Sequence, residues 1–356
     1  MPQVTLRQIA EKVGCSRSTV SYALRNSPYI SPETRKKVVD VAKDLGWRPD
    51  AELNITMSSI RQSSTQKIAP TIAVVINMPK KKLGRNSASS LHLEGVRQRA
   101  DELGFGVDEF NLAEQPLSPA RLKGILEARQ FRGVVFIGTI YPSLPETYLE
   151  IGKGFTCSVC GIRYPKVPFH VTVPDFLAAG RMAISEMLKE GCKRPGVFIT
   201  KVVDEPLDWG FSGGAFSGLL DVPVEDRLPI FLIDYMDPGH SFNFDSIEAW
   251  MHQYLPDTIL TLDIINTRKA FENSTEQWIR EVPCYSLDWY PDQAAISGVD
   301  LMQRDVGKAA VDLVFDQLSK GQSGIPECQQ SVNIEGIWAT KESYKESHFY
   351  GVTHDA

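Results

Sequence analysis

The sequence predicts an N-terminal all-α domain followed by an α/β core of two doubly wound, parallel-sheet lobes. In the first fifty residues, apolar side chains recur at the three- and four-residue spacing of helices that bury one face. From residue 71 onward, short apolar runs alternate with helical patterns, which is typical of parallel strands covered by helices on both faces. A chain of 356 residues with 42% hydrophobic content is long enough for two or three domains with separate cores.

The first two helices are predicted from their apolar spacing and their caps. Thr5 and Gln8 stand in the relation of a capping box, and Gly14 begins a tight turn after the first helix. The buried face of this helix consists of Leu6, Ile9, Ala10 and Val13. Ser16 can cap the second helix through its hydroxyl. That helix buries Val20 and Leu24, and its outer face consists of Arg17, Ser18, Ser21, Tyr22 and Arg25.

A third helix follows, with Ser31 as its cap, Pro32 in its first position and Glu33 near the positive end of the helix dipole. Its apolar repeat consists of Val38, Val41, Ala42 and Leu45. Two short helices joined by a glycine turn, with donors on the outer face of the second, suit the major groove of DNA. Other small three-helix domains share this pattern, so the pattern alone leaves DNA binding and a purely structural domain open.

Six segments in order resemble the head of the lac repressor family of transcriptional regulators. They are Val4-Thr5-Leu6-Arg7-Gln8-Ile9-Ala10, Val13-Gly14-Cys15-Ser16, Ser18-Thr19-Val20-Ser21, Leu24-Arg25-Asn26, Ile30-Ser31-Pro32-Glu33-Thr34-Arg35 and Leu45-Gly46-Trp47-Arg48-Pro49. The resemblance implies base-reading roles for Arg17, Ser18 and Tyr22. It implies DNA-backbone contacts from Thr5, Ser16, Thr19, Ser21, Arg25 and Arg35. Tyr22 replaces the arginine that is common in the family, which leaves the preferred bases open.

The charge of the chain is distributed unevenly. Residues 1–62 carry ten Lys and Arg against six Asp and Glu, a net of +4, which leaves 28 against 38, a net of −10, for the remainder. A basic head on an acidic body can engage phosphates at one end only, whereas the overall charge of −6 argues against a protein that coats nucleic acid.

Residues 48–67 follow the head. The resemblance implies a hinge helix that orders on DNA and inserts an apolar side chain into the minor groove, which kinks the duplex. The positions in question are Leu53, Asn54, Thr56 and Met57. Thr56 stands where the family usually has leucine. Leu53 and Met57 flank this position and could supply the inserted side chain, and Met57 is the better candidate if the register shifts by one residue. A simple flexible linker is the alternative.

The core elements are predicted from alternating apolar runs and helical patterns. The strands are expected at residues 71–78, 105–110, 133–138, 156–162, 195–200, 229–236, 257–263 and 283–289. Helices are expected at residues 91–103, 176–190, 246–254 and 305–318, with others starting at Ser118-Pro119, Trp209 and Asn266. The architecture repeats although the sequence does not, which indicates two similar lobes with a cleft between them.

This core also resembles that of the same family, which is built like periplasmic binding proteins and whose chain crosses between the lobes three times. The predicted domains are residues 1–47 as a helix-turn-helix head, 48–67 as hinge and linker, 68–342 as an effector-binding and dimerisation core, and 343–356 as a tail. Lobe 1 is expected at residues 69–168 and 296–323, and lobe 2 at residues 169–295 and 324–342. The tail has no apolar heptad series, so no helical tetramerisation bundle is expected.

Ligands of open α/β sheets lie beyond the carboxyl ends of the strands, which selects a set of candidate effector contacts. These are Asn77, Tyr141, Arg163, Trp209, Phe211, Asp263, Asp288 and Trp289. By resemblance, Asp263 and Asp288 take the places of polar residues that hold a sugar, and carboxylates with an aromatic ring suit that ligand. Trp209 lies where the family commonly has an arginine before a glycine, which leaves the effector class open. Each of these residues could equally be a helix cap or a satisfied strand end.

Other classes of function are less well supported by the sequence. Asp263, Asp288 and Asp292 could form a glycosidase acid pair, but no nucleophile elbow, phosphate loop or metal-ligand set accompanies them, so no enzyme, cofactor or metal is expected. Cys157 and Cys160 invite a metal or redox interpretation, but they lie in an apolar run without a second ligand pair. The six cysteines, the lack of a signal-peptide-like start and the lack of a membrane-length apolar span predict a cytoplasmic protein, nucleoid-associated when on DNA.

The sequence therefore predicts a transcriptional repressor that binds a pseudo-palindromic operator as a homodimer. A small ligand in the cleft, a sugar or sugar derivative, is expected to control it. The alternative is a solute-binding protein whose head binds DNA only weakly.

Overall fold

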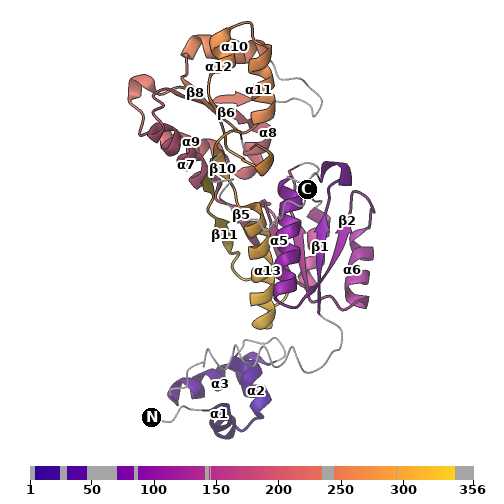
Figure 1. The fold of residues 1–356 in the computed structure, drawn as a ribbon. Helices are drawn as coiled ribbons and strands as arrows, with labels where there is room; N and C mark the ends of the chain where they lie inside the picture. Colours follow the sequence, from indigo (N-terminus) through magenta and orange to yellow (C-terminus); the bar gives the residue numbers. More distant parts are fainter. Residues whose placement is uncertain are drawn as a thin grey trace. The chain divides into compact units, whose positions relative to one another are not determined.

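The computed structural model describes residues 5–24, 30–45, 70–83, 87–140, 144, 146–234, 244–293 and 295–340. The chain divides into two compact units, Met1–Ala69 with Phe315–Gln322 and Pro70–Val314 with Ser323–Ala356. Figure 1 shows the ribbon with many of the helices and strands labelled. The predicted hinge and linker at residues 48–67 and the tail after residue 340 lie outside the described residues.

The head contains three helices, α1 (Leu6–Val13), α2 (Arg17–Leu24) and α3 (Pro32–Asp44). The predicted capping box is present, and Gly14 adopts a left-handed backbone with φ of 76° that lets the chain turn directly into α2. Ser31 accepts a hydrogen bond from the Thr34 N–H and so caps α3. The three helices bury a small common core of Ile9, Ala10, Val13, Val20, Ala23, Val38 and Ala42.

The first lobe is built on a six-stranded parallel sheet in the order β11-β5-β4-β3-β1-β2. Its strands are β1 (Thr71–Ile76), β2 (Gly106–Asn111), β3 (Gly133–Ile137), β4 (Thr156–Cys160), β5 (His170–Pro174) and β11 (Ser331–Ile334). Around it lie α5 (Ala88–Glu102), α6 (Pro119–Ala128), α13 (Gln303–Ser319) and the 3-10 segments η1 (Lys80–Lys82) and η2 (Glu146–Gly154).

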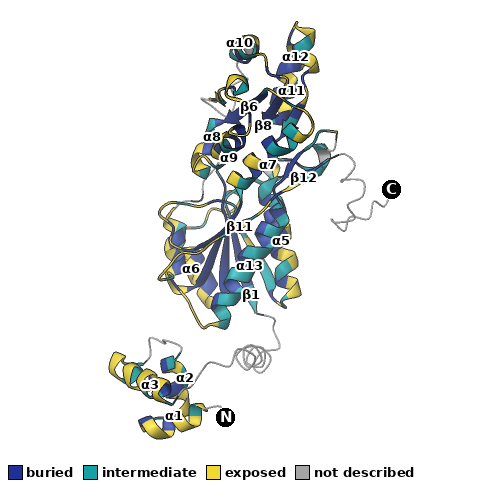
Figure 2. Cartoon of the chain, turned by 90° about the vertical axis from the view of Figure 1, so that its left-hand side faces the viewer, coloured by how far each residue is buried: buried dark blue, intermediate teal, exposed yellow. Residues whose placement is uncertain are grey.

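Helices cover both faces of this sheet, which is why its central strands are apolar without alternation. On one face, Leu122 and Leu126 of α6 pack against Val134 and Phe136 of β3. On the other face lie α5 and α13, and Figure 2 shows the two helical layers on opposite sides of the strands. The Ser158 hydroxyl donates a hydrogen bond of 2.8 Å to the Ala310 carbonyl of α13, so this buried polar group is satisfied.

The second lobe has the sheet order β12-β10-β9-β8-β6-β7, parallel except for the antiparallel pair β10 and β12. Its strands are β6 (Pro195–Thr200), β7 (Phe231–Ile233), β8 (Thr258–Thr261), β9 (Cys284–Ser286), β10 (Gly298–Asp300) and β12 (Ile337–Ala339). Its α-helices are α7 (Phe176–Lys189), α8 (Lys201–Asp204), α9 (Gly210–Leu219), α10 (Phe244–Tyr254), α11 (Ile264–Asn273) and α12 (Gln277–Glu281). Its 3-10 segments are η3 (Glu205–Leu207), η4 (Val224–Asp226) and η5 (Pro291–Gln293).

Two apolar clusters cover the two faces of the second sheet, one with α7 and α9 and the other with α10, α11 and α12. The first depends on glycines. A Cβ atom on Gly180 would lie 2.6 Å from the Phe211 carbonyl oxygen, and one on Gly214 would lie 2.2 Å from the Leu177 carbonyl oxygen. The α7 and α9 backbones therefore approach each other more closely than any side chain would allow.

The sheet order shows three crossings between the lobes, after β5, after β10 and between β11 and β12. The lobe bounds differ from those expected from the sequence. Residues 170–174 and 331–334 pair in the first sheet, and residues 298–300 pair in the second. These strands lie beside the crossings, and their apolar pattern carries no information about which sheet they join.

Candidate DNA-binding head and effector pocket

The outer face of α2 carries the residues predicted to read bases. Arg17 and Ser18 are exposed, and Tyr22 is 49% exposed. Val20 and Ala23 point the other way, into the core of the head, and are 0% and 2% exposed. The helix therefore separates an apolar face from a face of hydrogen-bonding side chains, as a helix that enters a DNA groove requires.

Several of the predicted DNA-backbone contacts also shape the head itself. The Thr19 N–H donates a hydrogen bond of 3.0 Å to the Ser16 hydroxyl, which confirms the predicted cap of α2. The Thr5 hydroxyl accepts a hydrogen bond of 3.4 Å from the Gln8 N–H. Arg35 donates from Nη2 to the Ile30 carbonyl oxygen at 3.2 Å. Ser21 lies on the half-buried part of α2. Their contacts with phosphates remain predictions.

Six predicted site residues lie outside the described residues. These are Arg25 of the head, Leu53, Asn54, Thr56 and Met57 of the hinge, and Tyr141 of the core. Their predicted roles are unchanged.

A cavity of about 410 Å³ lies beyond the carboxyl ends of the strands of both sheets. The first lobe contributes residues that follow β1, β3 and β4, namely Met78, Gly138, Thr139, Ile140, Gly161 and Ile162. The second contributes Phe176, Val203, Leu207, Phe211, Leu262 and Asp288. The remaining lining residues are Ser87, Ala88, Ser89, His92, Pro174, Leu301 and Gln303. The position agrees with the general rule for ligand sites in open α/β sheets.

Phe211 and Asp288 are the predicted effector residues that line this cavity. The ring of Phe211 packs on that of Phe176 with the centroids 4.9 Å apart. The start of α9 is held by the buried Asp204, whose carboxylate accepts hydrogen bonds from the N–H groups of Phe211 and Ser212 at 2.9 and 3.0 Å. Phe211 is therefore fixed in the pocket wall by its own backbone.

Asp288 is the acidic side chain of the cavity. Its Oδ2 accepts a hydrogen bond of 2.8 Å from the Tyr290 hydroxyl, whereas its Oδ1 is buried without a hydrogen-bond partner. Burial raises the pKa of Asp288 to about 6, and the nearby charge of Asp300 adds to this rise. A buried acceptor without a partner favours a ligand that donates a hydrogen bond.

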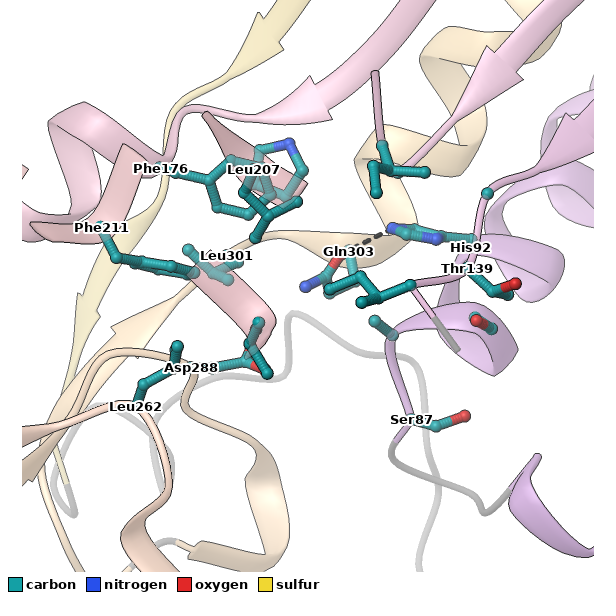
Figure 3. Close-up of a pocket in the computed structure, with 18 of the residues that line it drawn as sticks. Ser87, His92, Thr139, Phe176, Leu207, Phe211, Leu262, Asp288, Leu301 and Gln303 are labelled. Carbon is teal, nitrogen blue, oxygen red and sulfur yellow. Dashed lines mark hydrogen bonds between the residues drawn. The ribbon is translucent and has the colours of Figure 1, made fainter. Parts of the chain in front are cut away.

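Several polar residues of the cavity were not predicted from the sequence, among them the pair His92 and Gln303. Nε2 of His92 in α5 lies 2.6 Å from Oε1 of Gln303, the first residue of α13 (Figure 3). Burial lowers the pKa of His92 to about 4, so the ring is neutral near neutral pH. The only sequence signal for this pair was a histidine within the apolar repeat of the helix at residues 91–103.

Other predicted effector residues lie away from this cavity. Asp263 caps α11 by accepting a hydrogen bond of 3.1 Å from the Asn266 N–H, and buried Trp289 donates from Nε1 to the Ile296 carbonyl oxygen at 2.8 Å. Trp209 precedes α9 in a left-handed backbone with φ of 57°, and Asn77 follows β1. Exposed Arg163 lines a second cavity of about 240 Å³. The alternative interpretation of these residues as helix caps or satisfied strand ends therefore accounts for the hydrogen bonds of Asp263 and Trp289.

Cys157 and Cys160 lie buried in β4. Burial raises the pKa of both thiols, that of Cys160 to about 12, so neither is a thiolate at neutral pH. Among the described residues, no group of three or more His, Cys, Asp or Glu side chains is placed to hold a metal ion. The same part of the chain has no helix with the length and apolar character needed to span a membrane.

A helix-turn-helix head and a two-lobed α/β core with a pocket define a DNA-binding transcriptional regulator. Residues 5–50 match the model of the bacterial regulatory proteins of the lacI family. MalR of Streptococcus pneumoniae is 25% identical over 338 residues, which cover 92% of this chain and 97% of the relative. DegA of Bacillus subtilis is 23% identical over 191 residues, about half of each chain, 53% in both cases. Residues 5–50 thus match the lacI family, as the sequence of the head had indicated, and a relative of nearly the same length is a transcriptional regulator.

Solved structures confirm the predicted fold. The lac repressor dimer bound to operator and an anti-inducer covers 95% of this chain and 98% of its own, with 17% identity and a TM-score of 0.55. The complex of the regulator CelR with cellobiose covers 96% of this chain and 100% of its own, with 18% identity and a TM-score of 0.53. The relatives named are regulators rather than enzymes.

Proposed function

We propose that this protein is a repressor that binds a pseudo-palindromic operator as a homodimer and is controlled by a small ligand in the 410 Å³ pocket. The observation that carries the proposal is the outward-facing polar side of α2 in a chain that also holds a ligand-sized cavity. A two-fold dimer would present two α2 helices to an inverted repeat.

On DNA, Arg17, Ser18 and Tyr22 would read base edges. The backbone would be held by Thr5, Ser16, Thr19, Ser21, Arg25 and Arg35. Since Ser16 and Thr19 are hydrogen-bonded to each other, they would hold the start of α2 against the phosphates while that helix enters the groove. The hinge segment would add a minor-groove contact through Leu53, Asn54, Thr56 and Met57.

Control by the ligand would be a shift between lobe arrangements. The pocket takes residues from both lobes, so a ligand that fits one arrangement better than another changes their populations. The ligand then changes operator affinity if the two arrangements place the hinges of the dimer differently.

A carbohydrate is the effector class we propose. Asp288 can accept from a sugar hydroxyl, and the rings of Phe176 and Phe211 offer an apolar surface to a sugar ring. The solved complex of the relative CelR with cellobiose supports this class. Arg163, Asp263 and the remaining predicted residues would contribute only if the lobes close further around the ligand.

Selection of binding sites from random duplex DNA, followed by anisotropy at two salt concentrations, tests the DNA function. Enrichment of an inverted repeat that is bound far more tightly than random DNA is the expected result. Binding that disappears with salt and enriches no motif would instead favour the alternative of a solute-binding protein whose head touches phosphates only.

A further inference from the structure

The outer surface of α7 and α9 in the second lobe carries exposed apolar side chains. Phe216 and Leu220 lie four residues apart on one face of α9 and are 61% and 54% exposed, and exposed Val224 follows in η4. Leu177 of α7 is also exposed, and its carbonyl oxygen would lie 2.2 Å from a Cβ atom on Gly214, so it adjoins this face. We call Leu177, Phe216, Leu220 and Val224 the α9 patch.

The sheet does not cover the α9 patch. Helix α9 contains no charged residue, and its inner face already packs on the sheet through buried Phe211, Ala215 and Leu219. The neighbouring helix α7 lies beside it and not over it (Figure 1). A helix that is apolar on all sides is normally buried on all sides, and a cluster of exposed apolar side chains marks a surface that binds another segment.

The chain that follows β12 can reach this surface. β12 is the edge strand beside β10, and α7 packs against both, whereas α9 packs against β6. Four strand positions separate β12 from β6, a distance of about 19 Å at the usual spacing of about 4.8 Å. Extended chain covers about 3.3 Å per residue, so residues 341–349 can span about 30 Å. This is enough to pass over α7 and reach α9.

The sequence of this segment suits an apolar surface. Residues 341–356 lie outside the described residues, and they include Tyr344, Phe349 and Tyr350. Aromatic rings of this kind bury a large apolar area at each contact. We propose that residues 341–350 fold back over α7 and cover the α9 patch of the same chain, with the aromatic side chains of the segment on Phe216 and Leu220.

The charges beside the patch agree with this occupant. Glu225 is exposed, and its carboxylate has no ion-pair partner within the described part of the chain, whereas the carboxylate of neighbouring Asp226 pairs with Arg194 at 2.8 Å. The segment supplies Lys341 and Lys345 among its first residues. A segment with aromatic and basic side chains is therefore complementary to an apolar patch with an acidic rim.

The contact would act on the effector pocket through α9. The outer face of this helix carries Phe216, and its inner face carries Phe211, which lines the pocket. A segment bound to the outer face would hold the helix that forms this wall. The contact itself requires neither DNA nor a ligand, so it can be tested apart from the proposed function.

Site-specific cross-linking of the full-length protein locates the segment. Benzoylphenylalanine in place of Phe216 should form cross-links within one chain to residues 341–356, identified by mass spectrometry of the peptides. Benzoylphenylalanine in place of Ile265, which is 59% exposed on α11 over the other face of the sheet, should form none with these residues. Cross-links from position 216 only to a second copy, or to none of residues 341–356, would overturn the proposal.

An apolar dye provides a second measurement. Replacing both Phe349→Ser and Tyr350→Ser should raise the binding of anilinonaphthalene sulfonate by at least about threefold, in a protein with an unchanged circular dichroism spectrum. Adding Phe216→Ser should remove most of this increase. The paired changes Ser343→Ala and Ser347→Ala, in the same segment, should leave dye binding as in the wild type. Dye binding that stays at the wild-type level without the two aromatic residues would contradict the proposed cover.

Discussion

At the scale of single residues, the side chains of α2 determine how the head would recognise DNA. Arg17 and Tyr22 are exposed and contribute little to the core of the head, so their truncation tests recognition rather than folding. Each of Arg17→Ala and Tyr22→Ala should weaken binding to the preferred operator by about 1–3 kcal/mol and relax base preference at one position.

Anisotropy on the selected operator, on single-base variants and on random duplex would measure both effects. Arg129→Ala, which removes an exposed arginine of the core that pairs with Asp108, is the matched charge control. An equal loss on operator and random DNA would mean that the replaced side chain touches phosphate instead of bases.

Asp288 provides a second prediction at this scale, on stability. Burial raises its pKa from 3.8 to about 6, so the folded state holds a proton more tightly than the unfolded state. This contribution to stability is complete below the unfolded pKa and is lost as the pH rises through about 6. Asp288→Asn should therefore increase stability near neutral pH by about 1–2 kcal/mol.

Denaturant unfolding of both proteins between acidic and neutral pH would show the difference. The gain from Asp288→Asn should shrink as the pH falls from about 7 to 4. His92 acts in the opposite direction, because burial lowers its pKa to about 4 and its protonation destabilises the fold as the pH falls. It is present in both proteins, so it cancels in the comparison to first order. A gain that is independent of pH would show that Asp288 is not the group that titrates.

At the scale of elements, the contact of α7 with α9 depends on glycine rather than on side-chain fit. A Cβ atom on Gly180 would lie 2.6 Å from two backbone atoms of α9, which cannot move independently of the helix. Gly180→Ala should therefore destabilise the core by about 1–3 kcal/mol through overpacking. Gly213 is the matched control, since it lies in α9 with open space around its Cβ position. Gly213→Ala should stabilise the helix by about 0.5–1 kcal/mol.

Denaturant midpoints would show whether Gly180→Ala lowers the stability and Gly213→Ala raises it. A loss of similar size in both would point to the backbone of the helices and not to their contact. Because Gly180 packs against the Phe211 carbonyl, Gly180→Ala should also weaken ligand binding more than Gly213→Ala does.

The helices and strands could be predicted from the sequence because burial of one face gives the apolar residues a regular spacing. The capping box of α1, the Ser16 cap and the central strands of both sheets follow from local patterns and lie where they were expected. For β5, β10 and β11, the sequence did not predict which of the two sheets each strand joins. Pairing at a crossing is decided by long-range packing, and a short apolar strand satisfies either sheet equally.

Only part of the candidate site could be predicted from the sequence, because some of its residues carry a local signal and others do not. Asp288 and Phe211 follow strand ends or open a helix, which is a local signal, and both line the pocket. His92 and Gln303 are more than two hundred residues apart in the sequence, and their hydrogen bond forms only in the folded chain. No local sequence pattern predicts such a contact. Asp263 and Trp289 stand at similar strand ends, yet their polar groups are hydrogen-bonded to nearby backbone atoms.

At the scale of the whole molecule, the proposed function predicts a dimer. Two copies related by a two-fold axis are what an inverted-repeat operator requires. Sedimentation velocity over a range of concentrations should therefore give a dimer in the absence and presence of operator. A tetramer that persists on dilution would contradict this expectation.

Regulation by a ligand makes a further prediction for the whole molecule, because coupling between the pocket and the operator-binding head is reciprocal. If a neutral sugar that binds the pocket changes operator affinity by some factor, saturating operator must change sugar affinity by the same factor, typically about 5- to 150-fold. Both affinities would be measured at fixed salt, by anisotropy and by calorimetry. Arg17→Ala should weaken operator binding and leave sugar affinity without DNA unchanged, since Arg17 lies in the head and the pocket in the core. Sugar binding without any change in operator affinity would remove ligand control from the function, because a ligand with equal affinity for both arrangements shifts neither.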